Sequence, residues 1–170
     1  MLSLLPVVFC AGLITPSLPP TRAALLESPF RHVRTTNTNV QRLLETGVDK
    51  SPTFASLLGR LNASDVIVYI EQTTSMPKTL EGRLLLMPLA NQQRYLRIQI
   101  TRYGSPDELI ALIGHELRHA IEVADAPDVR DETALERLYR RIGVGSAAQH
   151  SYDTDAARTI GRQVRKELLA

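Results

Sequence analysis

The residues best suited to do chemistry are two histidines and a glutamate between residues 113 and 120. His115 and His119 are four positions apart, and Glu116 directly follows the first of them. Residues at this spacing on an α-helix stand on one face, so both imidazoles can bind a single metal ion. The neighbouring carboxylate then lies beside the open position of the metal, where it can take a proton from a bound water. The spacing predicts one Zn²⁺ per chain and a hydrolytic reaction with Glu116 as general base.

The segment around this motif carries the signals of a helix. Ser105 and Glu108 have the spacing of a capping box, and Pro106 occupies the first helical position. Apolar residues recur at helical spacing and form one stripe: Leu109, Ile113, Leu117, Ala120 and Ala124. His115 and His119 lie on the opposite side. The helix can therefore pack against a core while both histidines face a ligand.

A catalytic zinc ion needs a third protein ligand in addition to its water. The candidates downstream of the motif are three carboxylates and one further histidine: Glu122, Asp153, Asp155 and His150. Glu122 lies about two turns beyond His115, which suits a hydrogen bond to His119 or an ion pair with Arg118 better than direct metal binding. Either aspartate can instead cap the last predicted helix.

Two segments, residues 115–125 and 151–157, resemble the gluzincin branch of the zincin metallopeptidases. In that branch a glutamate on a later helix is the third ligand, and CAAX prenyl endopeptidases carry it as E-x-x-A-D. The run Asp153-Thr154-Asp155-Ala156-Ala157 is similar to that pattern. The resemblance assigns the third ligand to Asp153, ahead of Asp155 and His150. The chain has aspartate where glutamate is usual, and Ala157 where an acid would hold the first histidine. The motif helix also resembles short bacterial proteins with H-E-L-x-H-A-x-E.

The resemblance implies a zinc metallopeptidase that acts on a peptide or protein substrate. Glu116 would accept the proton of the water and pass it to the leaving amine. The oxyanion needs a further donor, and the candidates within sequence reach are Tyr152, Tyr139, His150 and Arg118. In zincins the strand before the motif helix pairs with an extended substrate, and this role falls to residues 94–101. The alternative is a non-catalytic protein whose zinc is structural, with four protein ligands or a degenerate site.

The patterning outside the motif predicts an α+β fold. Three β-branched or alternating segments read as strands and directly precede the motif helix, at residues 65–71, 82–87 and 94–101. Further helices are expected at residues 39–46, 52–61, 131–142 and 154–169. The order indicates a zincin-like architecture, with a small antiparallel or mixed sheet packed on the motif helix and flanking helices.

Composition and the amino terminus set the remaining expectations. A chain of 170 residues that is 44% hydrophobic has the size of one globular domain, assigned here to residues 39–170. Its formal charge of +2 gives no reason to expect nucleic-acid binding. Residues 1–23 resemble a signal peptide, which implies a periplasmic or extracellular protein without a membrane span in the mature chain; without such a signal the protein is cytoplasmic. Residues 24–38 are expected to be a linker or a poorly ordered segment, with His32 at the surface.

Overall fold

The computed structural model of this chain describes residues 28–77, 80–90, 93–144 and 153–170. The predicted signal peptide, His150 and Tyr152 lie outside these residues. Within them the strands are β1 (Val33–Arg34), β2 (Val66–Thr73), β3 (Gly82–Ala90) and β4 (Gln93–Thr101). The helices are α2 (Thr38–Lys50), α3 (Pro52–Asn62), α4 (Pro106–Ala124), α5 (Glu132–Ile142) and α6 (Asp155–Leu168). None of the helices in this described part is long and apolar enough to cross a membrane.

The strands form one mixed sheet, which confirms the α+β prediction. Their order is β1-β2-β4-β3; β1, β2 and β4 are parallel, and β3 is antiparallel to β4. β4 is an interior strand, because Tyr95 faces Ile67 of β2 on one side and Met87 of β3 on the other. The expectation that residues 94–101 pair with a substrate is therefore wrong. β3 is the edge strand next to the motif helix.

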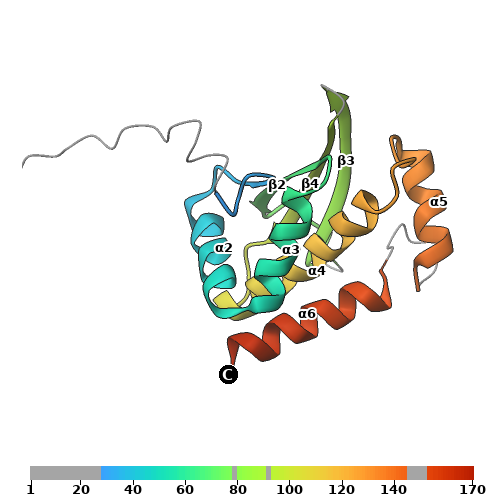
Figure 1. Cartoon of the computed structure of the whole chain (residues 1–170). Coiled ribbons are helices and arrows are strands. Elements are labelled where there is room, and N and C mark those ends of the chain that lie inside the picture. Colours follow the sequence, from blue (N-terminus) through green and yellow to red (C-terminus); the bar gives the residue numbers. More distant parts are fainter. Residues whose placement is uncertain (1–27, 78–79, 91–92, 145–152) are drawn as a thin grey trace, which may run out of the picture.

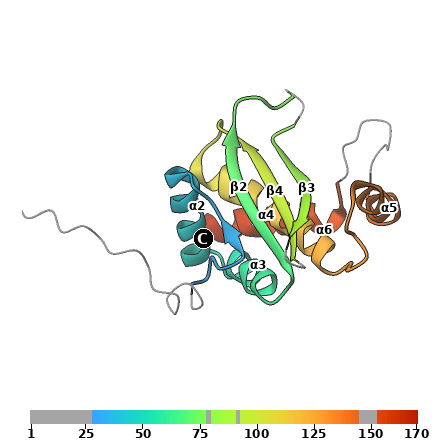
Figure 2. The ribbon, with the colours of Figure 1, turned by 90° about the horizontal axis from the view of Figure 1, so that it is seen from above.

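The elements are stacked in layers, with the motif helix α4 between the sheet and α6 (Figures 1 and 2). One face of β4 packs inward, because alternate residues from Arg94 to Ile100 are buried along its length. The core beneath the sheet includes fully buried apolar side chains of β4 and of the helices α3 and α4: Phe54, Leu58, Leu96, Ile98, Ile110, Ile113, Leu117 and Ile121. α4 is thus held from two sides, and only the flank that carries its histidines faces a groove.

The helix starts follow the capping signals in the sequence. The Ser105 side chain accepts from the backbone of Glu108, whose carboxylate accepts in return from the Ser105 backbone, so the predicted capping box is confirmed. At α6 the cap is Thr154, whose side chain accepts from the Ala157 backbone. The alternative that Asp153 or Asp155 caps this helix is therefore wrong.

The segment before α2 is more ordered than a linker. Val33 is fully buried and pairs with Val68 in parallel, so β1 extends the sheet within the range 24–38. The expectation for His32 is wrong, because its side chain lies inside and its Nδ1 is 3.1 Å from the Val66 carbonyl oxygen. Burial lowers the pKa of His32, and the Arg31 charge lowers it further. This histidine is a structural contact between the segment that leads into β1 and strand β2.

Candidate metal centre

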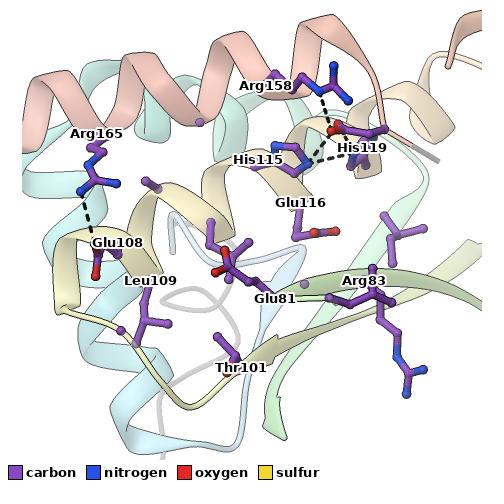
Figure 3. Close-up of a pocket in the computed structure, with 18 of the residues that line it drawn as sticks. Glu81, Arg83, Thr101, Glu108, Leu109, His115, Glu116, His119, Arg158 and Arg165 are labelled. Carbon is purple, nitrogen blue, oxygen red and sulfur yellow. Dashed lines mark hydrogen bonds and ion pairs between the residues drawn. The ribbon is translucent and has the colours of Figure 1, made fainter. Parts of the chain in front are cut away.

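Three predicted ligands come together at one end of α6. The Nε2 atoms of His115 and His119 are 3.2 Å apart. Asp153 Oδ1 lies 3.4 Å from the first and 3.7 Å from the second. Figure 3 shows the side chains of His115, His119 and Arg158 close together at this end of α6. A His-His-Asp group of this kind could bind a metal ion, since one ligand atom from each residue lies within 4.8 Å of the others.

Close packing of α6 on α4 brings Asp153 to the histidines. A Cβ atom at Gly161 would lie 3.3 Å from the Cβ of His115, and one at Gly114 would lie 3.0 Å from Val164 Cγ2. Both contacts are at or below the normal limit for side chains, so a glycine on each helix allows the close approach. The helices run in opposite directions, because Arg165 reaches Glu108 at the start of α4 while Asp153 reaches His119 further along. The start of α6 is therefore held beside the histidine flank of α4.

The orientation of His119 is set by Glu122 and Thr154. The Nδ1 atom of His119 is 2.8 Å from Glu122 Oε2, and the Thr154 hydroxyl donates to Glu122 Oε1 at 2.7 Å. Burial alone would raise the pKa of Glu122, but the hydrogen bonds from His119 and Thr154 lower it below its ordinary value. Glu122 is therefore an anion that holds the proton on Nδ1 and leaves Nε2 free to accept a metal. The predicted partnership of Glu122 with His119 is confirmed.

The Thr154 hydroxyl caps α6 and also donates to the Glu122 carboxylate. Substitution of Thr154 therefore tests whether these two contacts stabilise the fold. We expect Thr154→Val to lower the free energy of unfolding by about 2 kcal/mol, because one cap and one buried hydrogen bond are lost together. Thr154→Ser keeps both hydroxyl contacts and should stay within about 1 kcal/mol of the parent chain. Urea unfolding of the two variants measures the difference. Equal stability of the valine and serine variants would contradict the role assigned to the hydroxyl.

Asp153 is fixed in place by an arginine of its own helix. Arg158 Nε donates to Asp153 Oδ2 at 2.6 Å, and Oδ1, which accepts from the Thr154 backbone N–H at 2.7 Å, faces the histidines. Burial would raise the pKa of Asp153, but the hydrogen bond from Arg158 and the charge of His115 lower it. Asp153 is thus ionised at neutral pH, as a metal ligand must be. Asp155 points away: its side chain is 81% exposed and lies 3.8 Å from Arg158.

The protonation of His115 also favours metal binding. Burial lowers the pKa of His115, and the neighbouring His119 lowers it further. A neutral imidazole has a free lone pair, whereas an imidazolium cannot bind a metal. A lowered pKa therefore favours the neutral, metal-binding form of His115 beside the ionised Asp153.

Glu116 lies on the same flank of α4, buried against the edge strand. Its side chain points toward β3 below His115 (Figure 3) and packs so closely on Gly82 that an added Cβ there would clash with the Glu116 carboxylate. Burial raises the pKa of Glu116 to about 7; the charge of His119 opposes this shift, and that of Asp153 adds to it. A carboxyl group with this pKa can both accept and donate a proton at neutral pH.

These residues lie in a groove of about 890 Å³ between β3 and α6. One wall is the start of β3 with the segment before it, and the other is the polar face of α6. Tyr139 of α5 also lines the groove, and its ring meets the His119 ring edge-on at 5.5 Å. Burial raises the pKa of Tyr139 well above its ordinary value, so its hydroxyl keeps its proton. Arg118 is not among the groove-lining residues that the structure describes, so the described geometry gives no support to its role as oxyanion donor.

Several residues of the site carry no signal in the sequence. Arg158 reads as a solvated helix residue, and only the packing of α6 shows that it orients Asp153. The sequence offers Asp153 or Asp155 as the cap of the last helix, whereas Thr154 takes this position, and its second bond to Glu122 depends on tertiary structure. Gly82 reads as the start of a strand, and its contact with Glu116 depends on β3 being at the sheet edge.

Comparison with other proteins adds no assignment. No protein-family model, curated protein or solved structure matches this chain. The function must therefore be inferred from the geometry of the site itself.

Proposed function

We propose that this protein is a zinc-dependent hydrolase, and most specifically a metallopeptidase. The observation that carries the proposal is the position of Glu116, a buried carboxyl group with a pKa of about 7 on the same flank as the His115, His119 and Asp153 group. A purely structural metal site needs no proton acceptor beside it. A hydrolytic site needs one whose pKa lies near the working pH.

The ligand geometry fits zinc closely. Tetrahedral ligands at about 2.0–2.1 Å from Zn²⁺ are about 3.3–3.4 Å from one another. The separations of 3.2, 3.4 and 3.7 Å among the three donor atoms are close to this edge length. Two imidazoles and a carboxylate also leave the fourth position of a tetrahedral ion for water, as catalytic zinc sites do.

The chain's own residues supply the remaining parts of a hydrolytic reaction. A bound zinc ion would lower the pKa of a coordinated water and polarise a carbonyl group. Glu116 accepts the proton of the attacking water and returns it to the leaving amine. Glu122 and Arg158 keep His119 and Asp153 in place, which avoids reorganisation during the reaction. Tyr139 retains its proton and lies beside His119. Among the predicted oxyanion donors that the structure describes, it is the candidate that lines the groove.

The edge strand supports a peptide as the substrate. The start of β3 lines the groove opposite α6, and β3 is paired on its other side with β4. An extended peptide can add to such an edge through main-chain hydrogen bonds. Strands followed by the H-E-x-x-H helix with a later carboxylate ligand are also the arrangement of zincin metallopeptidases. The proposed assignment is therefore to a zincin-like peptidase with Asp153 as its third ligand.

The proposal is tested by elemental analysis and peptidase assays on two matched variants. We expect about one zinc ion per parent chain, together with cleavage of a mixed peptide library. Asp153→Ala should weaken zinc binding by at least about 100-fold, because one of three ligands is lost. Asp155→Ala, two residues away and exposed, should bind zinc and cleave peptides as the parent does.

Two outcomes would decide against a zinc peptidase. Absence of zinc after refolding with excess metal, or stoichiometric iron in its place, would overturn the assignment of the metal. Stoichiometric zinc without hydrolysis of any peptide would favour the second candidate, a non-catalytic zinc protein. In that case removal of zinc by a chelator should lower the stability strongly, as it does for structural sites.

A further inference from the structure

The wall of the groove formed by α6 carries a row of three arginines. Arg158, Arg162 and Arg165 follow one another at helical spacing, and all three line the groove. The row runs past the metal centre, since Gly161 packs on His115. Positive groups are thus placed along the path of any ligand that reaches the histidines.

Two of these arginines already have acidic partners. Arg158 is bound to Asp153 and also lies near Asp155. Arg165 lies 3.2 Å from Glu108 at the start of α4. Arg162, in contrast, forms no ion pair within the described part of the chain. Its guanidinium donates only to the Thr159 hydroxyl there, at 3.1 Å. Glu81, on the opposite wall, makes no ion pair with it.

We infer that Arg162 binds a carboxylate of the substrate, so that the site acts on peptides with a free carboxyl group near the scissile bond. This inference rests on the proposed peptidase function. Arg162 is exposed and directly follows Gly161, which packs on His115. Its side chain can therefore reach a substrate group that lies one or two residues away from the bond held at the metal centre. Guanidinium binds carboxylate in a bidentate, charge-assisted manner and discriminates strongly against a neutral amide. The carboxylate can be the C-terminus of a short peptide or an acidic side chain.

The test is binding, measured by calorimetry on the Glu116→Gln chain, which keeps the groove without its proton acceptor. The probes are acetyl-Leu-Ala-Leu as free acid and as amide, and the amides of acetyl-Leu-Glu-Leu and acetyl-Leu-Gln-Leu. The free acid of the first pair or the glutamate peptide of the second should bind about tenfold more tightly than its neutral counterpart. The pair that shows the difference identifies the source of the carboxylate. The measurements are made with zinc and again in EDTA, because zinc itself attracts carboxylates.

Two further arginine variants identify the residue responsible. Arg162→Gln should reduce the preference to within about twofold, whereas Arg42→Gln on α2, outside the groove lining, should retain it. The inference would be overturned if the Glu116→Gln chain binds neither acid, or binds the acids and the neutral peptides equally. It would also be overturned if Arg162→Gln retains the full preference for the acidic peptide. Zinc binding with peptide cleavage but no acid preference would remove this inference alone. An Arg162-dependent preference in EDTA, in a chain that binds no zinc, would remove the peptidase proposal and leave the carboxylate site.

Discussion

Glu116→Gln should strongly reduce peptide hydrolysis and at the same time make the metal-free chain more stable at pH 8. Both effects arise from one feature, a carboxyl group that burial holds at a pKa of about 7 rather than 4.5. Loss of the general base should lower kcat by about 10²–10⁴-fold. Zinc should remain bound, because His115, His119 and Asp153 are unchanged.

The stability effect has a defined sign and pH range. The folded chain holds the Glu116 proton up to about pH 7, whereas the unfolded chain releases it near 4.5. Stability of the metal-free protein therefore falls as the pH rises between these values and stays low above them. Glutamine is neutral throughout, so the variant should gain up to about 3 kcal/mol at pH 8 and nothing at pH 4.

Urea unfolding in EDTA at pH 4 and pH 8 measures this gain, with Glu45→Gln on the exposed face of α2 as the matched control. The control should change the stability by less than about 0.5 kcal/mol at either pH. A Glu116 variant that is less stable than the parent at pH 8 would show that the carboxylate is stabilised in the fold. It would also remove the main argument for a proton acceptor. A stable variant with full peptidase activity would assign the proton transfer to another group.

The motif helix could be predicted from the sequence because its signals are local. Ser105, Pro106 and Glu108 specify the start of α4, and the apolar stripe specifies its buried side. The alternation in residues 94–101 likewise gave the half-buried strand β4. Each of these features depends on backbone chemistry within a few residues, which is visible in the sequence.

The remaining features of the site depend on contacts between distant segments. The order of the strands in the sheet decides which edge faces the groove. The order of the strands along the chain does not reveal that β2 pairs with β4 and leaves β3 at the edge. The position of Asp153, the proposed third ligand, depends on how closely α6 approaches α4, which Gly114 and Gly161 permit. The resemblance to the E-x-x-A-D motif places Asp153 ahead of Asp155. No local signal in the sequence separates the two aspartates physically or reveals that Arg158 orients Asp153.

Arg94→Met should be the most destabilising single substitution outside the apolar core. Arg94 occupies a core-facing position of β4, and its side chain is completely buried. It makes paired contacts of 2.9 and 2.6 Å with Asp65, and it donates to the carbonyl oxygens of Val123 and Ala126 at 2.6 and 2.7 Å. Methionine preserves much of the stem but none of these bonds. We expect a loss of about 3–5 kcal/mol, because buried carbonyl groups at the end of α4 and a carboxylate lose their donor together.

Arg97→Met provides the control from the opposite face of the same strand. Arg97 is 40% exposed and lies 3.9 Å from Glu71, so its loss should cost less than about 0.5 kcal/mol. Denaturant unfolding of both variants gives the comparison, and a difference below about 1 kcal/mol would contradict the role of Arg94. Its bonds also fix the helix end directly after Glu122, the residue that orients His119. Arg94→Met should therefore weaken zinc binding even under conditions in which the variant is fully folded, whereas Arg97→Met should not. A folded Arg94 variant with parental zinc affinity would show that the metal centre is held by α6 alone.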